Sequence, residues 1–423
     1  MYRASSTLDI VPRTMRSRIG GSHNAMPPKT GPFTDTRATI LIGADTFFPD
    51  INGAARFTQD HAVRLARRGH DVHIVAPATN TRSLSRTEVF DGQWITVHRL
   101  RSVKWPLHDW LRVTPPWEVR TQARQILLNV APAVVHIQSF IDIGRGLAYE
   151  AHKLGVPIVA TNHVMPDNIV EFSGLPERFH PRLTRYGWNL ASKVYSKADI
   201  VTSPTAIAAR YLEAQTSLLD VIPVSCGIDV DRFTPKQTRP VENRVLFVGR
   251  LDPEKNLATL LTAFNFISAE FHAHLDIVGS GSERSRLQEH AQALGITDRV
   301  TFHGYVGDDQ LTDIHRRATV FVMPSTAELQ SIATLEAMAS GTPVILADAM
   351  ALPHLVTSGR EGYLVHPRNA REFADSIERI LHLEPEKYMR MSEAALATAR
   401  THDALTVTAQ YEQLYRQTWT PVA

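Results

Sequence analysis

The stretch VFVMPSTAELQSIATLEAMASGTPVILAD, residues 320–348, decides the fold class. Its apolar ends, VFVMPS (320–325) and PVILAD (343–348), are typical of buried strands. Between them the spacing predicts a short helix that has Ser331 as its N-cap and Gly341 at its C-terminal stop. Strand, helix and strand in this order form the repeating unit of a parallel α/β sheet.

The N-terminus of this predicted helix is a candidate anion site. The first backbone N–H groups of a helix have no partner inside it, and they point toward whatever lies in front of the cap. Glu328 lies just outside that cap, and Glu336 follows eight residues later within the helix. A carboxylate beside an anion site suits a ligand that carries both phosphate and neutral hydroxyl groups.

The rest of the chain repeats the same pattern in two series. The first series of apolar runs covers 39–44, 71–77, 134–139, 157–163 and 200–204, and the second covers 245–249, 275–279, 300–304, 320–325 and 343–348. Helical stretches separate the runs, and 226–243 is rich in chain-breaking residues, which predicts a linker. We therefore expect two Rossmann-like, doubly wound parallel sheets, with a ligand-binding cleft between the carboxyl ends of their strands.

Composition narrows the class of protein. The 423 residues are 43% hydrophobic and 21% charged, typical of a soluble globular protein of two domains. The leader 1–36 has five basic and two acidic side chains, a net charge of +3. Because the formal net charge of the whole chain is +2, the remaining residues carry a net charge of −1. Bulk charge therefore does not favour nucleic-acid binding. The leader is predicted to be disordered, with a targeting segment or a misassigned start as alternatives. The single cysteine, Cys226, is interpreted as a packing residue in a reducing compartment.

Several side chains follow the predicted strands and are candidates for binding. Arg250 and Lys255 follow the strand 245–249, where two cations suit a diphosphate; solvated loop charges are the alternative. Asn52 and Gly53 lie in the loop FPDINGA (48–54) between the first strand and the first helix, which is either a phosphate loop or a plain tight turn. His163 ends the run 157–163, as a ligand for a sugar hydroxyl or a structural histidine.

Three other patterns are weaker. Asp229 and Asp231 form an acidic pair that could hold a metal, but such turns are common and no metal site is predicted. Gly279 and Gly281 follow a strand without the third glycine of a dinucleotide fingerprint, because position 284 is Arg. Residues 99–120 interleave basic side chains with three tryptophans, which suits either a membrane surface or an ordinary surface loop.

Taken together, these motifs resemble the retaining glycosyltransferases of family 4, which have the GT-B fold. The resemblance covers roughly residues 38–420, and it is carried by GRLDPEKN (249–256), the E-x7-E segment ending in EAMASGTPV (336–344), and VSCGIDVDRFTP (224–235). It implies an acceptor-binding domain at 37–225, completed by a C-terminal helix at about 403–423, the linker 226–243, and a nucleotide-sugar domain at 244–402. Three departures stand out: Leu329–Ser331 instead of Gly-Phe-Gly, Cys226 instead of Asn, and Asn52 instead of Gly.

The resemblance also implies roles for single residues. The donor diphosphate would be held by Arg250, Lys255 and backbone amides near Gly53 and Gln330–Ile332. Glu328 would bind hydroxyls of the donor sugar, Glu336 would bind the ribose, and His163 would contact the sugar. The base and ribose would lie along Gly279–Gly281 and Tyr305–Asp308. The full set of expected donor-binding residues is Asn52, Gly53, Arg250, Lys255, Gly279, Gly281, Tyr305, Val306, Asp308, Gln330, Ser331, Ile332 and Glu336.

The sequence-based hypothesis is an enzyme that transfers a hexose, with retention, from a nucleotide diphosphate sugar to an acceptor hydroxyl without a cofactor. Asp308 could pair with a guanine edge, which favours GDP-mannose over UDP-glucose as donor. The segment 99–120 favours a lipid or lipid-linked glycan acceptor, hence glycolipid biosynthesis in the cytoplasm by a protein peripheral to the membrane. The alternatives are a UDP-glucose-dependent glucosyltransferase acting on a small molecule or polysaccharide, and a non-catalytic nucleotide-binding module.

Overall fold

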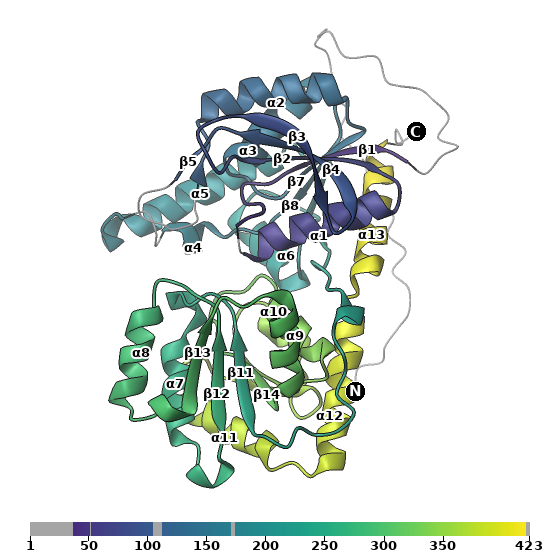
Figure 1. The fold of residues 1–423 in the computed structure, drawn as a ribbon. Helices are drawn as coiled ribbons and strands as arrows, with labels where there is room; N and C mark the ends of the chain where they lie inside the picture. Colours follow the sequence, from purple (N-terminus) through teal and green to yellow (C-terminus); the bar gives the residue numbers. More distant parts are fainter. Residues whose placement is uncertain (1–36, 51, 105–111, 171–173, 420–423) are drawn as a thin grey trace. The chain divides into compact units, whose positions relative to one another are not determined.

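The computed structural model describes residues 37–50, 52–104, 112–170 and 174–419, and it contains two large sheets (Figure 1). The predicted leader, 1–36, lies outside the described residues. The first sheet has the strand order β10-β9-β8-β7-β1-β2-β4-β3, and the second has the order β13-β12-β11-β14-β15-β16. All pairs are parallel except β3 with β4. The prediction of two doubly wound parallel sheets is confirmed.

The first sheet is built from the chain between residues 39 and 223. Its strands are β1 (Thr39–Gly43), β2 (Asp71–Pro77), β3 (Leu84–Phe90), β4 (Gln93–Leu100), β7 (Val134–Ile137), β8 (Ile158–Thr161), β9 (Ile200–Ser203) and β10 (Ile222–Pro223). Its helices are α1 (Gly53–Arg67), α2 (Pro116–Val130), α3 (Asp142–Leu154), α4 (Pro166–Val170), α5 (His180–Tyr195) and α6 (Ala206–Gln215). The short strands β5 (Val103–Lys104) and β6 (Arg112–Val113) pair separately.

The second sheet follows after the short 3-10 turn Val230–Arg232. Its strands are β11 (Arg244–Val248), β12 (His274–Val278), β13 (Val300–Gly304), β14 (Val320–Met323), β15 (Val344–Ala347) and β16 (Gly362–Val365). Its helices are α7 (Leu257–Phe266), α8 (Arg284–Ala293), α9 (Asp308–Arg317), α10 (Ile332–Ala339), α11 (Ala370–Leu381) and α12 (Pro385–Arg400), and α13 (Ala404–Trp419) ends the described chain.

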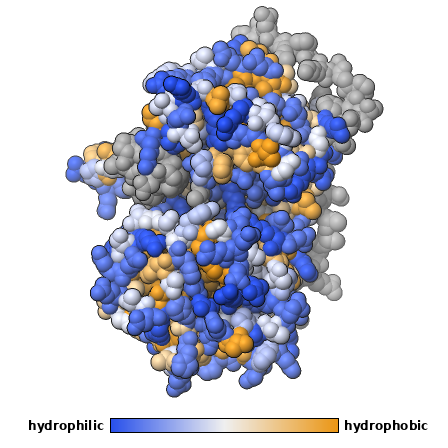
Figure 2. Space-filling model, viewed as in Figure 1, coloured by the Kyte–Doolittle hydropathy of each residue, from blue (hydrophilic) through white to orange (hydrophobic). Residues whose placement is uncertain are grey.

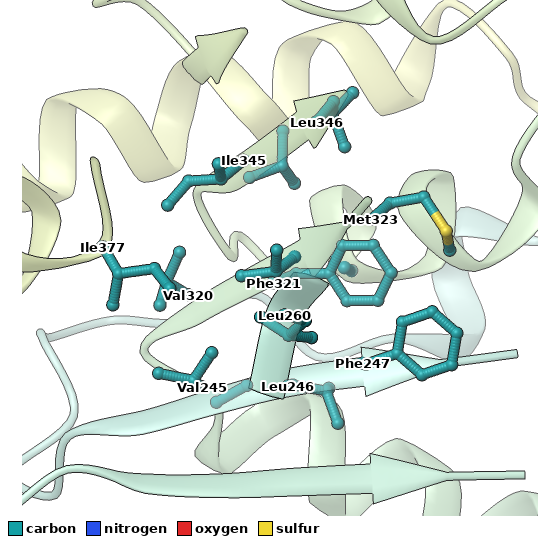
Figure 3. Close-up of a cluster of buried hydrophobic side chains, with 14 of the residues drawn as sticks. Val245, Leu246, Phe247, Leu260, Val320, Phe321, Met323, Ile345, Leu346 and Ile377 are labelled. Carbon is teal, nitrogen blue, oxygen red and sulfur yellow. The ribbon is translucent and has the colours of Figure 1, made fainter. Parts of the chain in front are cut away.

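The core explains why these runs become strands. Val245, Leu246 and Phe247 of β11 are completely buried between helices, and Phe321 of β14 lies beside them (Figure 3). A strand covered on both faces has no solvated side, so its sequence is continuously apolar instead of alternating. Each such buried side chain contributes roughly 1.5–3 kcal/mol, which fixes the position of the loops at the strand ends.

The last helix, α13, packs on the first sheet although it follows the second in the chain. Val407, Tyr411 and Tyr415 belong to the same buried cluster as Ile40 and Ile42 of β1. The Tyr415 hydroxyl group lies 2.9 Å from His61 Nε2 and 2.7 Å from His136 Nδ1, both of them buried. The position of α13 on the first sheet is therefore fixed by polar contacts in addition to apolar packing.

The visible surface is mostly hydrophilic, with hydrophobic residues scattered among charged ones (Figure 2). Trp94 and Trp117 are among the exposed aromatic side chains, 72% and 73% exposed. Within the described ranges, no helix combines the length and the hydropathy that crossing a bilayer requires.

Candidate active site

Two loops of the second sheet bring opposite charges together. Strands β11 and β14 are neighbours, so the segments at their carboxyl ends start side by side. Lys255 belongs to the 3-10 turn Pro253–Lys255 after β11, and Glu328 follows β14. The Lys255 ammonium group donates to Glu328 Oε1 at 2.6 Å, and both side chains are nearly buried. The structure thus joins two residues that are 73 positions apart in the chain.

Arg250 lies on the same loop, and two carboxylates orient it. Its guanidinium group donates to Asp252 Oδ2 at 2.5 Å and to Glu254 Oε1 at 2.7 Å. Asp252 also accepts from the Ser282 backbone N–H at 3.0 Å, which fixes the acceptor in turn. The Arg250 side chain as a whole is 28% exposed.

The N-terminus of α10 lies immediately beyond Glu328. Ser331 is its N-cap, and its hydroxyl accepts from the Thr334 N–H at 3.3 Å, as the sequence predicts. Ile332 and Ala333 are the first two residues of α10. The backbone amides of a first turn have no acceptor within the helix and lie at the positive end of its dipole. Gly341 has a φ of 67°, the left-handed conformation expected at the stop.

A second helix N-terminus lies close to the first. A Cβ atom placed on Gly53 would lie 3.7 Å from Cδ1 of Ile332, so the start of α1 adjoins the start of α10. Asn52 is the N-cap of α1, and its Oδ1 accepts from the Ala55 N–H at 2.9 Å. Asn52 has an extended backbone, φ −150°, so a glycine is not required there. The departure from the family pattern is explained by this cap.

Gln330 has a different task from its neighbours. Its Oε1 accepts from the Cys226 N–H at 2.7 Å, and its Nε2 donates to the Ser225 hydroxyl at 2.9 Å. The side chain therefore ties the loop before α10 to the start of the linker. Burial raises the pKa of the Cys226 thiol to about 12, so this thiol stays protonated and serves packing.

Glu336 lies on α10 and is 7% exposed. Burial raises the pKa of its carboxyl to about 7, against the opposing effect of the Arg56 guanidinium, whose Nη2 is 4.0 Å away. Asp308 and Asp60 raise this pKa further. Near neutral pH the group can thus accept from or donate to a hydroxyl of a ligand.

Asp308, the predicted guanine reader, is the first residue of α9 and is held by two arginines. Its Oδ2 lies 2.8 Å from Arg232 and its Oδ1 lies 3.5 Å from Arg56. Pairing with a base would require at least one of these ion pairs to open. Tyr305 in the preceding loop is 64% exposed and available to a flat ring, whereas Val306 is buried.

Gly279 and Gly281 are explained by contacts between loops. A Cβ atom on Gly279 would lie 1.9 Å from the Gly249 carbonyl oxygen, and one on Gly281 would lie 2.5 Å from the Leu251 backbone. Gly279 also has a φ of 128°. The glycines are needed so that the loop after β12 can pack on the loop after β11, which carries Arg250.

His163 lies after β8 in the first sheet and is partly buried. Its Nε2 is 2.8 Å from Gln138 Oε1, its Nδ1 is 3.9 Å from Cys226 Sγ, and its ring packs 4.8 Å from that of Phe57. Burial lowers the pKa of His163 to about 3, so the ring is neutral. The imidazole is therefore a fixed, uncharged group in the first sheet.

Two family models match adjacent parts of the chain: "Glycosyltransferase Family 4" matches residues 51–232 and "Glycosyl transferases group 1" matches 230–398. A GDP-mannose-dependent alpha-mannosyltransferase of Mycolicibacterium smegmatis is 30% identical over 335 residues, covering 77% of this chain and 84% of that protein. The chain belongs to the family 4 glycosyltransferases.

Other relatives of this glycosyltransferase differ in substrate. An alpha-monoglucosyldiacylglycerol synthase of Streptococcus pneumoniae is 25% identical, covering 77% of this chain and 75% of that protein. Among solved structures, sucrose-phosphate synthase of Thermosynechococcus elongatus matches with a TM-score of 0.72 at 21% identity, over 90% of this chain and 98% of that one. Anabaena HepE in complex with UDP-glucose matches with a TM-score of 0.69 at 18% identity, over 90% and 100%. The structural matches establish the fold.

Sequence reasoning missed three residues at or beside the candidate site. Arg56 and Arg232 engage Asp308 or Glu336, and Gln138 holds His163. The two arginines resemble ordinary surface charges in the sequence, because only the fold brings them to α9 and α10. Gln138 carries a signal, since it is a polar residue directly at the carboxyl end of a buried strand.

The described part of the basic and aromatic stretch 99–120 is divided among β4, β5, β6 and α2. Arg112 donates to the Ser102 hydroxyl at 2.7 Å, and Trp117 lies in the first turn of α2 as an exposed side chain. Trp105 and Trp110 lie outside the described residues. A membrane contact of the glycosyltransferase through this segment stays a prediction.

Proposed function

We propose that this glycosyltransferase moves a mannose from GDP-mannose to a hydroxyl of a lipid or lipid-linked glycan, with retention of the anomeric configuration. The observation that carries the proposal is the Lys255–Glu328 pair, 2.6 Å apart, directly before the capped N-terminus of α10. A cation, a carboxylate and free helix amides in one place match a ligand that joins a diphosphate to a sugar.

Charge stabilisation is the physical basis of the proposed reaction. When the bond between the sugar C1 and the diphosphate oxygen breaks, negative charge grows on the departing diphosphate. Lys255, Arg250 and the first-turn amides of α10 would stabilise that charge, because preorganised donors at a low-dielectric site act most strongly where charge develops. These groups supply positive charge without a metal or cofactor, so we propose that neither is needed.

Retention is proposed to follow from attack on the same face. The acceptor hydroxyl oxygen forms the new bond to C1 on the side from which the diphosphate leaves, and its proton passes to a diphosphate oxygen. The leaving group then serves as the base, and no protein carboxylate has to bond to C1. Glu328 would instead position the sugar by accepting from its hydroxyls.

Mannose is favoured as the transferred sugar because the Mycolicibacterium smegmatis relative, which is 30% identical to this chain, is a GDP-mannose-dependent enzyme. UDP-glucose is the second candidate, because Anabaena HepE binds it in a similar fold and the ion pairs of Asp308 leave the base unassigned. A lipid acceptor is supported by the similarity to the diacylglycerol enzyme. With such an acceptor, we propose peripheral attachment to the cytoplasmic face of a membrane.

The test is a transfer assay. The purified protein is incubated with radiolabelled GDP-mannose or UDP-glucose and a membrane extract, and label in the lipid fraction is counted. We expect transfer from GDP-mannose, with an α-linked product by NMR. Faster transfer from UDP-glucose would favour the second candidate, and binding without transfer or hydrolysis of any donor would indicate a non-catalytic module.

A further inference from the structure

Gln138 lies at the carboxyl end of β7, an inner strand of the first sheet, and has no part in the mechanism above. It follows β7 directly, its backbone N–H donates to the Gly43 carbonyl of β1 at 2.8 Å, and the residue is 2% exposed. Ligands of open α/β sheets bind at the carboxyl ends of the strands, where Gln138 stands. A polar side chain buried at this edge needs partners on all of its hydrogen-bonding atoms.

One half of the amide has such a partner. The neutral His163 ring donates from Nε2 to Gln138 Oε1 at 2.8 Å. This bond fixes the tautomer, so Nδ1 carries the lone pair on the side of the Cys226 thiol, 3.9 Å away. The contact with Phe57 fixes the ring plane. Gln138 is thus a positioning residue for His163.

The amino half of the Gln138 side-chain amide has no such partner. Gln138 Nε2 is buried and has no hydrogen-bond partner. Reversing the amide would only exchange the atoms, since the oxygen would then be left without a donor. The Oε1 and Nε2 atoms of Gln138 are bonded to the same carbon. Gln138 Nε2 therefore lies within about 5.5 Å of His163 Nε2. A buried donor without an acceptor is costly, which is a reason to look for a ligand.

A neighbouring loop repeats the pattern. Asn52 Nδ2 is likewise buried without a partner, although Asn52 Oδ1 accepts from Ala55 and Thr46. Asn52 belongs to the loop between β1 and α1, and β1 is paired with β7, which leads to Gln138. The loops that follow two adjacent strands of the first sheet thus each carry one buried, uncharged amide donor without a partner.

We propose that the Gln138 side-chain amide binds a sugar hydroxyl, with its N–H donating to the hydroxyl oxygen while its carbonyl orients His163. The inference rests on the proposed function. A neutral amide beside a neutral imidazole suits an uncharged hydroxyl, whereas the diphosphate is matched by the cations of the second sheet. The hydroxyl belongs either to the donor hexose or to the acceptor, and the two are separable by experiment.

The experiment introduces Gln138→Leu into the wild type and into a His163→Phe variant. Leucine removes both the N–H and the carbonyl of position 138, and phenylalanine removes the imidazole that the carbonyl orients. If the amide binds the donor hexose, Gln138→Leu weakens binding of GDP-mannose or UDP-glucose about tenfold in calorimetry in both backgrounds, while the affinity for GDP or UDP is unchanged. If it binds the acceptor, nucleotide-sugar affinity is unchanged and the acceptor KM rises about tenfold in both backgrounds. Either result supports the inference.

The controls make failure unambiguous. Gln125→Leu on the exposed face of α2 tests the effect of an added apolar side chain, and unchanged GDP or UDP affinity shows that each variant is folded. If Gln138→Leu impairs the wild type but causes no further loss in the His163→Phe variant, or has no effect in either background, the ligand role is overturned. A wild-type protein that binds no nucleotide sugar would overturn the proposed function itself.

Discussion

Lys255 and Glu328 form the ion pair on which the candidate site is built. Each is nearly buried, and each has the other as an opposite charge at 2.6 Å. An ion pair that has lost most of its water is expensive to build unless both charges are also used. We propose that the Lys255 ammonium group binds a diphosphate and that the Glu328 carboxylate binds sugar hydroxyls. The ion pair would then serve ligand binding and not only stability.

Replacing either partner by alanine should therefore slow transfer. We expect Lys255→Ala and Glu328→Ala each to reduce turnover at least ~100-fold, because each removes a group that stabilises the transition state. Lys387→Ala, at an exposed position of α12, is the matched control for the loss of a positive charge. Steady-state rates with saturating donor measure the effect, and near-normal rates in both site variants would refute the assigned roles.

Glu336 should make the stability of the protein depend on pH. Burial raises its pKa to about 7 from 4.5, so the folded protein holds a proton that the unfolded chain releases, and stability falls as the pH rises from about 4.5 to 7. Glu336→Gln removes this titration. Relative to the wild type, the variant should gain up to about 3 kcal/mol between pH 5 and pH 8 in urea unfolding without ligand. An equal difference at both pH values would contradict the assignment.

At the scale of single residues, the sequence predicted which residues lie at the candidate site, but it did not predict their hydrogen-bond partners. Arg250, Lys255 and Glu328 could be found because they follow apolar strands. The carboxylates of Asp252 and Glu254 that orient Arg250 could not, since loop geometry decides which acid reaches the guanidinium group. Gln138 was overlooked because one polar residue after a strand is common, and only its unpartnered amide makes it unusual.

At the scale of elements, the N-terminus of α10 is the feature to test. Ser331→Ala removes the cap and should lower the free energy of unfolding by about 1 kcal/mol. Because the first turn would fray, the variant should also bind a nucleoside diphosphate more weakly. Asn369→Ala removes the corresponding cap of α11 and should cost similar stability while leaving that affinity unchanged. Equal affinities in the two variants would remove α10 from the site.

Most elements with continuous apolar sequences were predictable, and the exceptions have physical reasons. Strands β3 and β4 were missed because they form an antiparallel edge whose outer strand is largely exposed, so β3 lacks an apolar run. Strand β16 was missed because it is an edge strand that begins with glycine and has two only partly buried central residues, so GYLV shows no continuous apolar run. Helix α10 was predictable since its cap and its stop are both local signals.

At the scale of the whole molecule, α13 depends on a buried carboxylate. Glu412 accepts from Arg68 at 2.6 and 2.8 Å and lies 3.0 Å from His70 Nε2. Burial raises the pKa of Glu412, but the hydrogen bonds from Arg68 and His70 outweigh it, so the pKa is lowered below 4.5. Its stabilisation is therefore complete above about pH 4.5 and is lost as the pH falls through the lowered value.

Glu412→Ala should accordingly destabilise the protein by about 2 kcal/mol at pH 7, because it leaves a buried histidine and an arginine without their acceptor. The difference from the wild type should narrow below pH 4.5. Unfolding followed by circular dichroism over pH 3–8 measures both effects. Glu386→Ala, at an exposed position of α12, controls for the loss of one negative charge, and a pH-independent difference at position 412 would contradict the explanation.

The division into two sheets was readable from two series of strands, but the ties across the chain were not. Contacts such as Gln330 to Cys226, Arg232 to Asp308 and Tyr415 to His136 join residues separated by about 75 to 280 positions. No local pattern encodes such pairs, because each depends on the completed fold.

The most direct test of the central claim is a crystal structure of the protein with GDP or UDP. We expect the diphosphate oxygens within hydrogen-bonding distance of Lys255 Nζ and of the first-turn amide of Ile332, with Arg250 beside them. A nucleotide bound elsewhere, with these groups making no contact to its phosphates, would contradict the proposed role of the second sheet.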